Sequence, residues 1–294
     1  MDAPLRFYTK PPEVVGWPWL FTTMLDWKYV INKDFECAIV DSGVEYFFLT
    51  KRMRDYPRHY LVRYRERAKL LGKMYGDRVW ITIPDYPDDY QPGLTHERGL
   101  DNVDKTLRNV EEFIDIDGVA WLPVIQSRYM NTFSFLESCE RLREIIGDYP
   151  RVAIGTVCKA RKHSWISYCI KTARAYFPHS WIHAFGLTLR VLSMLRPHAM
   201  LSFDSMAWDW YRSYCVGVLE RISFDSMAWN YDQLRHYDRA VGDSWRRKAP
   251  EIYAKLPARW PSSLRAKTAY FIAYVERISE ITGHDYTQYI RLRL

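Results

Sequence analysis

The chain has 294 residues, of which 48% are hydrophobic and 26% charged, a balance that excludes a disordered or fibrous protein and fits one large globular domain with an appendage. Its formal net charge of +7 favours polyanionic partners, although charge does not report on the fold. The five cysteines are scattered and form no C-x-x-C pair, so we expect neither a metal site nor a redox motif.

Apolar strand-like runs alternate with helix-like segments along most of the chain. The predicted strands are 37–43, 79–85, 119–126, 151–157, 181–187 and 199–205. The predicted helices are about 58–75, 95–115, 132–147, 164–177, 188–195 and 208–222. This alternation predicts βαβ units and a parallel sheet. Residues 6–10 and 223–229 as outer strands bring the count near eight, which favours a TIM (β/α)8-type barrel over residues 1–245.

One heptapeptide, SFDSMAW, occurs twice, at 202–208 and at 223–229. Each copy carries an aspartate, Asp204 or Asp225, at the end of a strand-like run, where a barrel enzyme presents a nucleophile or a base. Two copies indicate a local duplication, since repeat folds need at least about three units. The repeat alone leaves open which copy is used chemically.

Residues 246–294 differ from the rest of the chain. Their first part is basic and is interrupted by prolines. A helix capped by Ser263 and ended by Gly283 then follows. One face of this helix is apolar, with Phe271, Tyr274, Val275, Ile278 and Ile281. We therefore expect a helical C-terminal extension that packs on the barrel, with basic residues that either contact phosphates or form a solvated face.

The predicted strands end in polar residues or glycine. In chain order these are Asp41, Asp85, Gln126, Gly155, Gly186 and Asp204. An aspartate before Ser or Pro is usually a helix cap or a turn former. Six such positions at equivalent strand ends nevertheless favour a functional site, because barrel enzymes place catalytic residues at the carboxyl ends of their strands.

Six short segments with these strand ends match known motifs in order and spacing over residues 37–208. They are Asp41-Ser42-Gly43, Pro84-Asp85-Tyr86, Val124-Ile125-Gln126, Ala153 to Thr156, His183 to Leu187 and Leu201 to Ser205. They resemble D-S-G-G-F-Q, D-E-C, G-[IL]-V-Q-G, A-I-G-G, Y-M-G-V-G and D-x-F-D-C of the tRNA-guanine transglycosylases and their DNA-acting phage and viral relatives.

The resemblance implies a pentosyltransferase that exchanges guanine for a 7-deazaguanine base similar to preQ0. Asp204 would attack C1′ to form a covalent glycosyl-aspartate, and Asp41 would act as general acid and then general base.

The resemblance also assigns base-binding residues. Ser42, Asp85 and Gln126 would bind the guanine edge, and the Gly155 backbone N–H would approach the base. Phe185, followed by Gly186, would stack on its face. The family's opposing aromatic residue is Glu45 here, with Tyr46 as the nearest substitute.

Two departures from the family concern the polymer. The zinc-binding C-x-C-x-x-C…H set of the tRNA enzymes is absent, and Met206-Ala207-Trp208 stands in place of P-T-R. The resemblance therefore implies no metal and no cofactor, and it favours DNA as the partner, with tRNA and the queuosine or archaeosine pathway as the alternative.

Nucleic-acid contacts are expected beside the barrel mouth. The basic cluster after the strand at 151–157 would bind phosphates, and Trp208 after the nucleophile would hold a neighbouring base. The predicted contact residues are Lys159, Arg161, Lys162, His163 and Trp208. A solvated loop is the competing interpretation of the basic cluster.

Two other function classes stay open: an N-glycoside hydrolase that uses the same carboxylates with water, and a non-catalytic barrel that binds nucleobases or nucleic acid. No charged-then-apolar leader opens the sequence, and no apolar stretch reaches the roughly 20 residues that span a bilayer. We therefore expect a cytoplasmic protein, in the host cytoplasm if viral, without a membrane partner.

Overall fold

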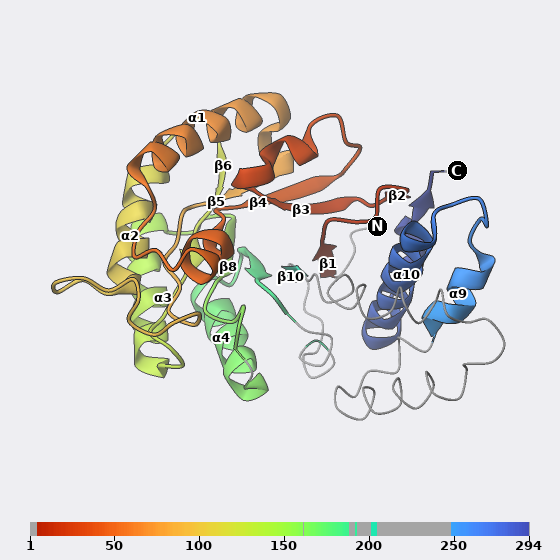
Figure 1. The fold of residues 1–294 in the computed structure, drawn as a ribbon. Helices are drawn as coiled ribbons and strands as arrows, with labels where there is room; N and C mark the ends of the chain where they lie inside the picture. The colour runs from red at the N-terminus through yellow and green to blue at the C-terminus, as the bar shows by residue number, and fades with distance from the viewer. Residues whose placement is uncertain (1–4, 161, 188–191, 193–200, 205–247, 294) are drawn as a thin grey trace. The chain divides into compact units, whose positions relative to one another are not determined.

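A computed structural model describes residues 5–160, 162–187, 192, 201–204 and 248–293 (Figure 1). The protein is a mixed α/β structure with parallel sheets. It divides into two compact units. The first unit consists of Met1–Lys10, Pro18–Leu187 and Pro197–Ser205, and the second of Pro11–Trp17, Thr188–Arg196 and Met206–Leu294.

Two parallel sheets form the centre of the first unit. One has the order β1 (Leu5–Tyr8), β10 (Leu201–Asp204), β9 (Trp181–Ala184), β8 (Arg151–Ile154) and β7 (Val124–Ile125). The other has the order β3 (Trp19–Thr23), β4 (Cys37–Asp41), β5 (Val79–Thr82) and β6 (Ala120–Leu122). Because all neighbours within each sheet run parallel, the carboxyl ends of the strands lie along one edge of each sheet.

The two sheets are linked at both sides. Pro123 alone separates β6 from β7, and its carbonyl accepts a hydrogen bond from the Ala153 backbone N–H at 2.8 Å. On the other side, Thr9 after β1 forms a parallel bridge with Leu20 of β3. The Thr9 carbonyl accepts the Phe21 N–H at 2.8 Å. The hydrogen-bonded ladder is thus interrupted at the proline, which has no N–H to donate, and shortened at Thr9.

Four helices of the first unit follow its strands and lie outside them (Figure 1). They are α1 (Arg58–Tyr75), α2 (Asn102–Phe113), α3 (Thr132–Ile146) and α4 (His163–Tyr176). Short helical turns η1 (Met24–Val30), η2 (Glu45–Thr50) and η3 (Gly76–Arg78) complete the connections. Gly72 of α1 packs so closely on the turn at Gly118 that a Cβ would collide with the Gly118 carbonyl.

The second unit joins the C-terminal helices to a segment from near the N-terminus. It contains β2 (Val15–Gly16), α9 (Ala249–Lys255), α10 (Ser262–Thr282), η5 (Thr287–Tyr289) and β11 (Arg291–Leu292). Strand β11 pairs antiparallel with β2. The buried rings of Trp17 and Phe271 meet edge to face at 5.4 Å. Residues 11–17 therefore belong to the same compact unit as the C-terminal helices.

Several predicted elements are confirmed with small changes in their ends. The helices expected near 58–75, 132–147 and 164–177 are α1, α3 and α4. The helix expected from residue 95 begins only at Asn102, because Asp101 forms a capping box with Asp104. No expected strand corresponds to β3. The expected helices at 188–195 and 208–222 and the second repeat at 223–229 lie outside the described residues, apart from Leu192.

The apolar face expected on the C-terminal helix is confirmed for most of its length. Phe271, Tyr274, Val275 and Ile278 of α10 are buried. The expected cap is wrong, since α10 begins at Ser262 after Pro261 and has no side-chain cap. Gly283 ends the helix with φ +72, a left-handed conformation that glycine adopts without strain. Among the described helices, none has both the length and the apolar character needed to cross a membrane.

Candidate functional site

A pocket opens at the carboxyl ends of the strands in the first unit. Five residues singled out from the sequence line it together: Asp41, Asp85, Gln126, Gly155 and Phe185. Each comes from a different strand end, since they end or closely follow β4, β5, β7, β8 and β9 in turn. The parallel strand order therefore gathers into one cavity residues that are far apart in the sequence.

Asp85 is the centre of a buried hydrogen-bond network on one wall of this pocket. Gln126 Nε2 donates to Asp85 Oδ2 at 2.6 Å, and Ser42 Oγ donates to Asp85 Oδ1 at 3.2 Å. Tyr56 donates from its hydroxyl to the Asp85 carbonyl oxygen at 3.0 Å. Burial raises the pKa of Asp85 to about 6, although the hydrogen bonds from Gln126 and Ser42 oppose this rise. A buried carboxyl that titrates near neutrality is typical of functional sites.

Gln126 presents an unused acceptor beside this carboxyl. Its Oε1 is buried and has no hydrogen-bond partner among the described residues. A buried amide oxygen without a partner costs roughly 1–3 kcal/mol. A ligand N–H that reached this oxygen would remove that cost.

Because Gly155 has no side chain, the Gln126 side chain can occupy the space beside it. A Cβ at this position would collide with Gln126 Nε2 and lie 2.9 Å from Val124 Cγ1. Its backbone N–H donates to the Ile125 carbonyl at 3.0 Å. The β7–β8 pairing uses this N–H, and its approach to the base stays a prediction. The glycine is needed here for close packing.

Phe185 is nearly buried at the pocket wall. Its ring meets the Phe21 ring at 6.3 Å and the His183 ring at 4.7 Å, both edge to face. Gly186 follows with φ +65, and a Cβ there would lie 2.8 Å from the Cys158 carbonyl oxygen. Gly186 does not itself line the pocket. Its role in the structure is a tight turn that only glycine fits.

The pocket carries a charged side chain at the position where the family has an aromatic ring. Glu45 lines the pocket, whereas the neighbouring Tyr46 does not and has an exposed ring. Lys159 Nζ lies 3.2 Å from Glu45 Oε1, so this predicted phosphate contact is engaged in an ion pair at the rim. Lys162 is exposed and directly precedes α4, which begins at His163, without a side-chain capping hydrogen bond.

The two predicted catalytic aspartates, Asp41 and Asp204, each stand at the end of a strand. Asp41 ends β4, and its Oδ2 accepts the Gly43 N–H at 2.8 Å. Asp204 ends β10, in register with Tyr8 of the neighbouring β1. The side chain of Asp204 lies outside the described part of the chain, as do Arg161 and Trp208.

The pocket residues that were not expected from the sequence include Asp89, Tyr90 and Cys158. Asp89 Oδ2 accepts the Lys159 backbone N–H at 3.0 Å, and burial raises the pKa of Asp89 to about 6. The only sequence signal was the run Pro87-Asp88-Asp89 after a strand end, which reads equally well as a turn.

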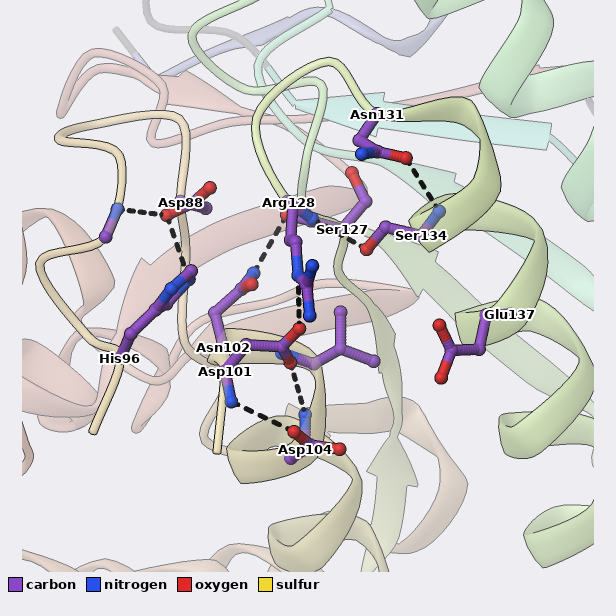
Figure 2. Close-up of polar contacts among 12 residues, drawn as sticks. Asp88, His96, Asp101, Asn102, Asp104, Ser127, Arg128, Asn131, Ser134 and Glu137 are labelled. Atoms are coloured by element: carbon purple, nitrogen blue, oxygen red, sulfur yellow. Dashed lines mark hydrogen bonds and ion pairs between the residues drawn. The ribbon is translucent and has the colours of Figure 1, made fainter. Parts of the chain in front are cut away.

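A polar network connects the loops that follow β5 and β7 (Figure 2). Asn102 Nδ2 donates to the Ser127 carbonyl at 2.8 Å, and Arg128 Nε donates to Asp101 Oδ2 at 2.5 Å. Asp85 and Gln126 directly precede these loops. The network therefore helps to hold the two base-edge candidates at a fixed spacing.

No family model and no curated protein matches this chain. In the described part of the chain, no group of three or more His, Cys, Asp or Glu side chains could hold a metal ion.

Proposed function

We propose that the protein is a pentosyltransferase that exchanges guanine in DNA for a 7-deazaguanine base through a covalent glycosyl-aspartate. The observation that carries this proposal is the common pocket of Asp41, Asp85, Gln126, Gly155 and Phe185. These are the positions that match the base-exchange motifs of the tRNA-guanine transglycosylases. Their shared position at the carboxyl ends of the strands supports a common functional site.

The fold proposed with this function is a closed (β/α)8-type barrel. Parallel pairings join β3, β4, β5 and β6 in one sheet and β7, β8, β9, β10 and β1 in the other, and Pro123 alone separates β6 from β7. The Thr9–Leu20 bridge next to β1 and β3 supports closure of the ring. When β6 and β7 are counted as one strand broken at Pro123, the number of parallel strands is that of a (β/α)8 barrel.

The pocket chemistry suits the Watson–Crick edge of guanine. That edge presents two neighbouring donors, the N1–H and the 2-amino group. The ionised Asp85 carboxylate and the unpartnered Gln126 Oε1 are both acceptors at one wall of the pocket. The donor–acceptor pattern favours guanine or a 7-deazaguanine over adenine, which lacks an N1–H.

The proposed reaction uses two carboxylates in turn. Asp204 attacks C1′ as the C1′–N9 bond breaks, and Asp41 delivers a proton to the departing guanine. Asp41 then removes the N9 proton of the incoming base, which attacks C1′ and releases Asp204. Two displacements retain the configuration at C1′, as in retaining glycosidases.

Exchange of labelled guanine tests this proposal without knowledge of the incoming base. The purified protein is incubated with radiolabelled guanine and, in parallel, single-stranded DNA, duplex DNA and tRNA. We expect label in DNA, most in single strands, because flipping a paired nucleotide costs a few kcal/mol. Label in tRNA alone would favour the tRNA alternative, and abasic sites without label would favour the hydrolase.

Guanine binding should weaken at acidic pH because of Asp85. The carboxylate accepts donors from the base only when ionised, and its pKa of about 6 places protonation in the range between pH 5 and 7. We expect about tenfold weaker binding near pH 5 than near pH 7, measured by calorimetry with free guanine. Asp85→Asn should bind weakly at both pH values. A tenfold pH effect that survived in Asp85→Asn would assign the titration to another group, with Asp89 the first candidate.

A further inference from the structure

We propose that single-stranded DNA lies along residues 51–59, hereafter the basic segment, on its way into the pocket. This inference rests on the proposed function and adds the surface that binds the polymer. It differs from the sequence-based expectation, which placed phosphate contacts at Lys159 and its neighbours.

The basic segment carries an uncompensated positive charge. Lys51, Arg52, Arg54 and Arg58 are exposed, and none of them forms an ion pair with a described residue. Lys159 differs from them because Glu45 lies 3.2 Å from its ammonium group. Four exposed cations within eight residues form a site that attracts phosphates.

The one acidic residue of the basic segment does not neutralise these cations. Asp55 Oδ1 accepts the Tyr56 N–H at 2.8 Å and the Tyr86 hydroxyl. Asp55 Oδ2 lies 3.2 Å from Lys105 Nζ, a buried ammonium group. The Asp55 carboxylate is therefore paired with Lys105 and not with the cations of the basic segment.

The basic segment is attached directly to the pocket. Glu45 of η2 lines the pocket, and residue 51 follows the end of η2. From within the segment, the Tyr56 hydroxyl lies 3.0 Å from Ser42 Oγ. Ser42 Oγ in turn lies 3.2 Å from Asp85 Oδ1. Two side chains thus connect the backbone of the basic segment to the carboxyl that is proposed to bind the base.

The side chains beside the basic segment suit a single strand better than a lipid surface. The exposed Tyr46 ring lies 5.5 Å from Lys51 Nζ, a pairing of ring and cation that can hold an unstacked base next to its phosphate. Tyr46 and Leu49 are the exposed large apolar residues of η2. Two such residues provide too little apolar area to anchor a protein in a membrane interface.

Two variants with equal loss of charge test the proposal. The segment variant carries Lys51→Gln, Arg52→Gln and Arg54→Gln. The control variant carries Lys69→Gln, Lys73→Gln and Lys171→Gln, all exposed residues of α1 and α4 for which no ion pair is found in the described structure. The probe is a fluorescein-labelled oligothymidylate of about 20 nucleotides, followed by anisotropy over a range of salt concentrations. It contains no guanine, so its binding does not depend on base exchange.

We expect the segment variant to bind the oligothymidylate roughly 100-fold more weakly at low salt. The slope of log affinity against log salt should fall by about 2, since each lost phosphate contact removes about 0.7 for single strands. The control variant should stay close to the unmodified protein in both slope and affinity. Both variants should bind free guanine normally, which shows that the pocket is intact.

Four results would overturn the inference. They are equal losses in the two variants, an unchanged segment variant, a segment variant that also loses guanine binding, and tighter binding of oligouridylate than of oligothymidylate. Loss of binding to phosphatidylserine vesicles with DNA binding intact would assign the basic segment to membranes instead. Failure of the proposed function has a different signature: no guanine binding and no exchange, whatever the oligothymidylate does.

Discussion

Asp204→Asn is expected to abolish exchange of labelled guanine into DNA, whereas Asp225→Asn leaves it near the level of the unmodified protein. An amide cannot form the glycosyl ester, so we expect a loss of at least about 10⁴-fold, or roughly 5.5 kcal/mol in the barrier. Initial rates of label incorporation measure this loss. Acid-trapped protein–DNA adducts should disappear in the Asp204 variant alone.

The chain supplies its own control for this experiment. Both aspartates stand in the same heptapeptide, so the two substitutions have the same local sequence. What separates them is Asp204's place at the end of β10, where Phe203 pairs with Ala184 of β9 and Phe185 follows as a pocket residue. Asp225 lies outside the described residues. Full activity in Asp204→Asn with none in Asp225→Asn would move the nucleophile to the second copy.

Asp41→Asn should slow exchange by about 10²- to 10⁴-fold while the affinity for free guanine changes little. Proton transfer by a positioned group contributes about this much, equal to roughly 3–5.5 kcal/mol. Asparagine is the appropriate substitution because its side-chain oxygen can still accept the Gly43 N–H that Asp41 Oδ2 accepts at 2.8 Å. The turn after β4 is thereby kept while the proton acceptor is removed.

Glu45→Gln is the matched control for Asp41→Asn. Glu45 is a second acidic residue of the same pocket, but its carboxylate faces Lys159 at 3.2 Å. We expect less than a tenfold change in turnover for this variant. Similar losses in both variants would indicate that overall pocket charge is what matters. An equal loss of guanine affinity and turnover in Asp41→Asn would indicate a binding role.

The strand ends could be predicted from the sequence, and the loops between them could not. Short apolar runs that alternate with helices identified β4, β5, β8 and β9, because such runs are typical of buried strands. Strand β3 was missed because no α-helix separates it from β4 and its pattern WLFTT follows a proline. Residues 95–101 were expected to be helical, but Glu97 and Leu100 form an isolated antiparallel bridge there, and Asp101 caps the helix that begins at Asn102.

The same distinction applies to the candidate site. Asp85 and Gln126 could be proposed as neighbours because parallel strands bring their ends to one edge, and their contact at 2.6 Å agrees with this expectation. The inclusion of Asp89 in the pocket could not be foreseen, since the backbone of Lys159 fixes its side chain. The packing role of Gly155 likewise depends on the position of the Gln126 side chain.

Two strands near the N-terminus pair with strands that come much later in the sequence, which bears on folding during synthesis. Leu5 of β1 pairs with Leu201 of β10, and Val15 of β2 pairs with Leu292 of β11. Domains usually fold from the N-terminus as they leave the ribosome, but here neither unit can be completed until its late partner has emerged. The β1–β10 and β2–β11 pairings therefore cannot form during most of translation. Nascent chains of this protein should therefore have a long window in which chaperones can bind these strands.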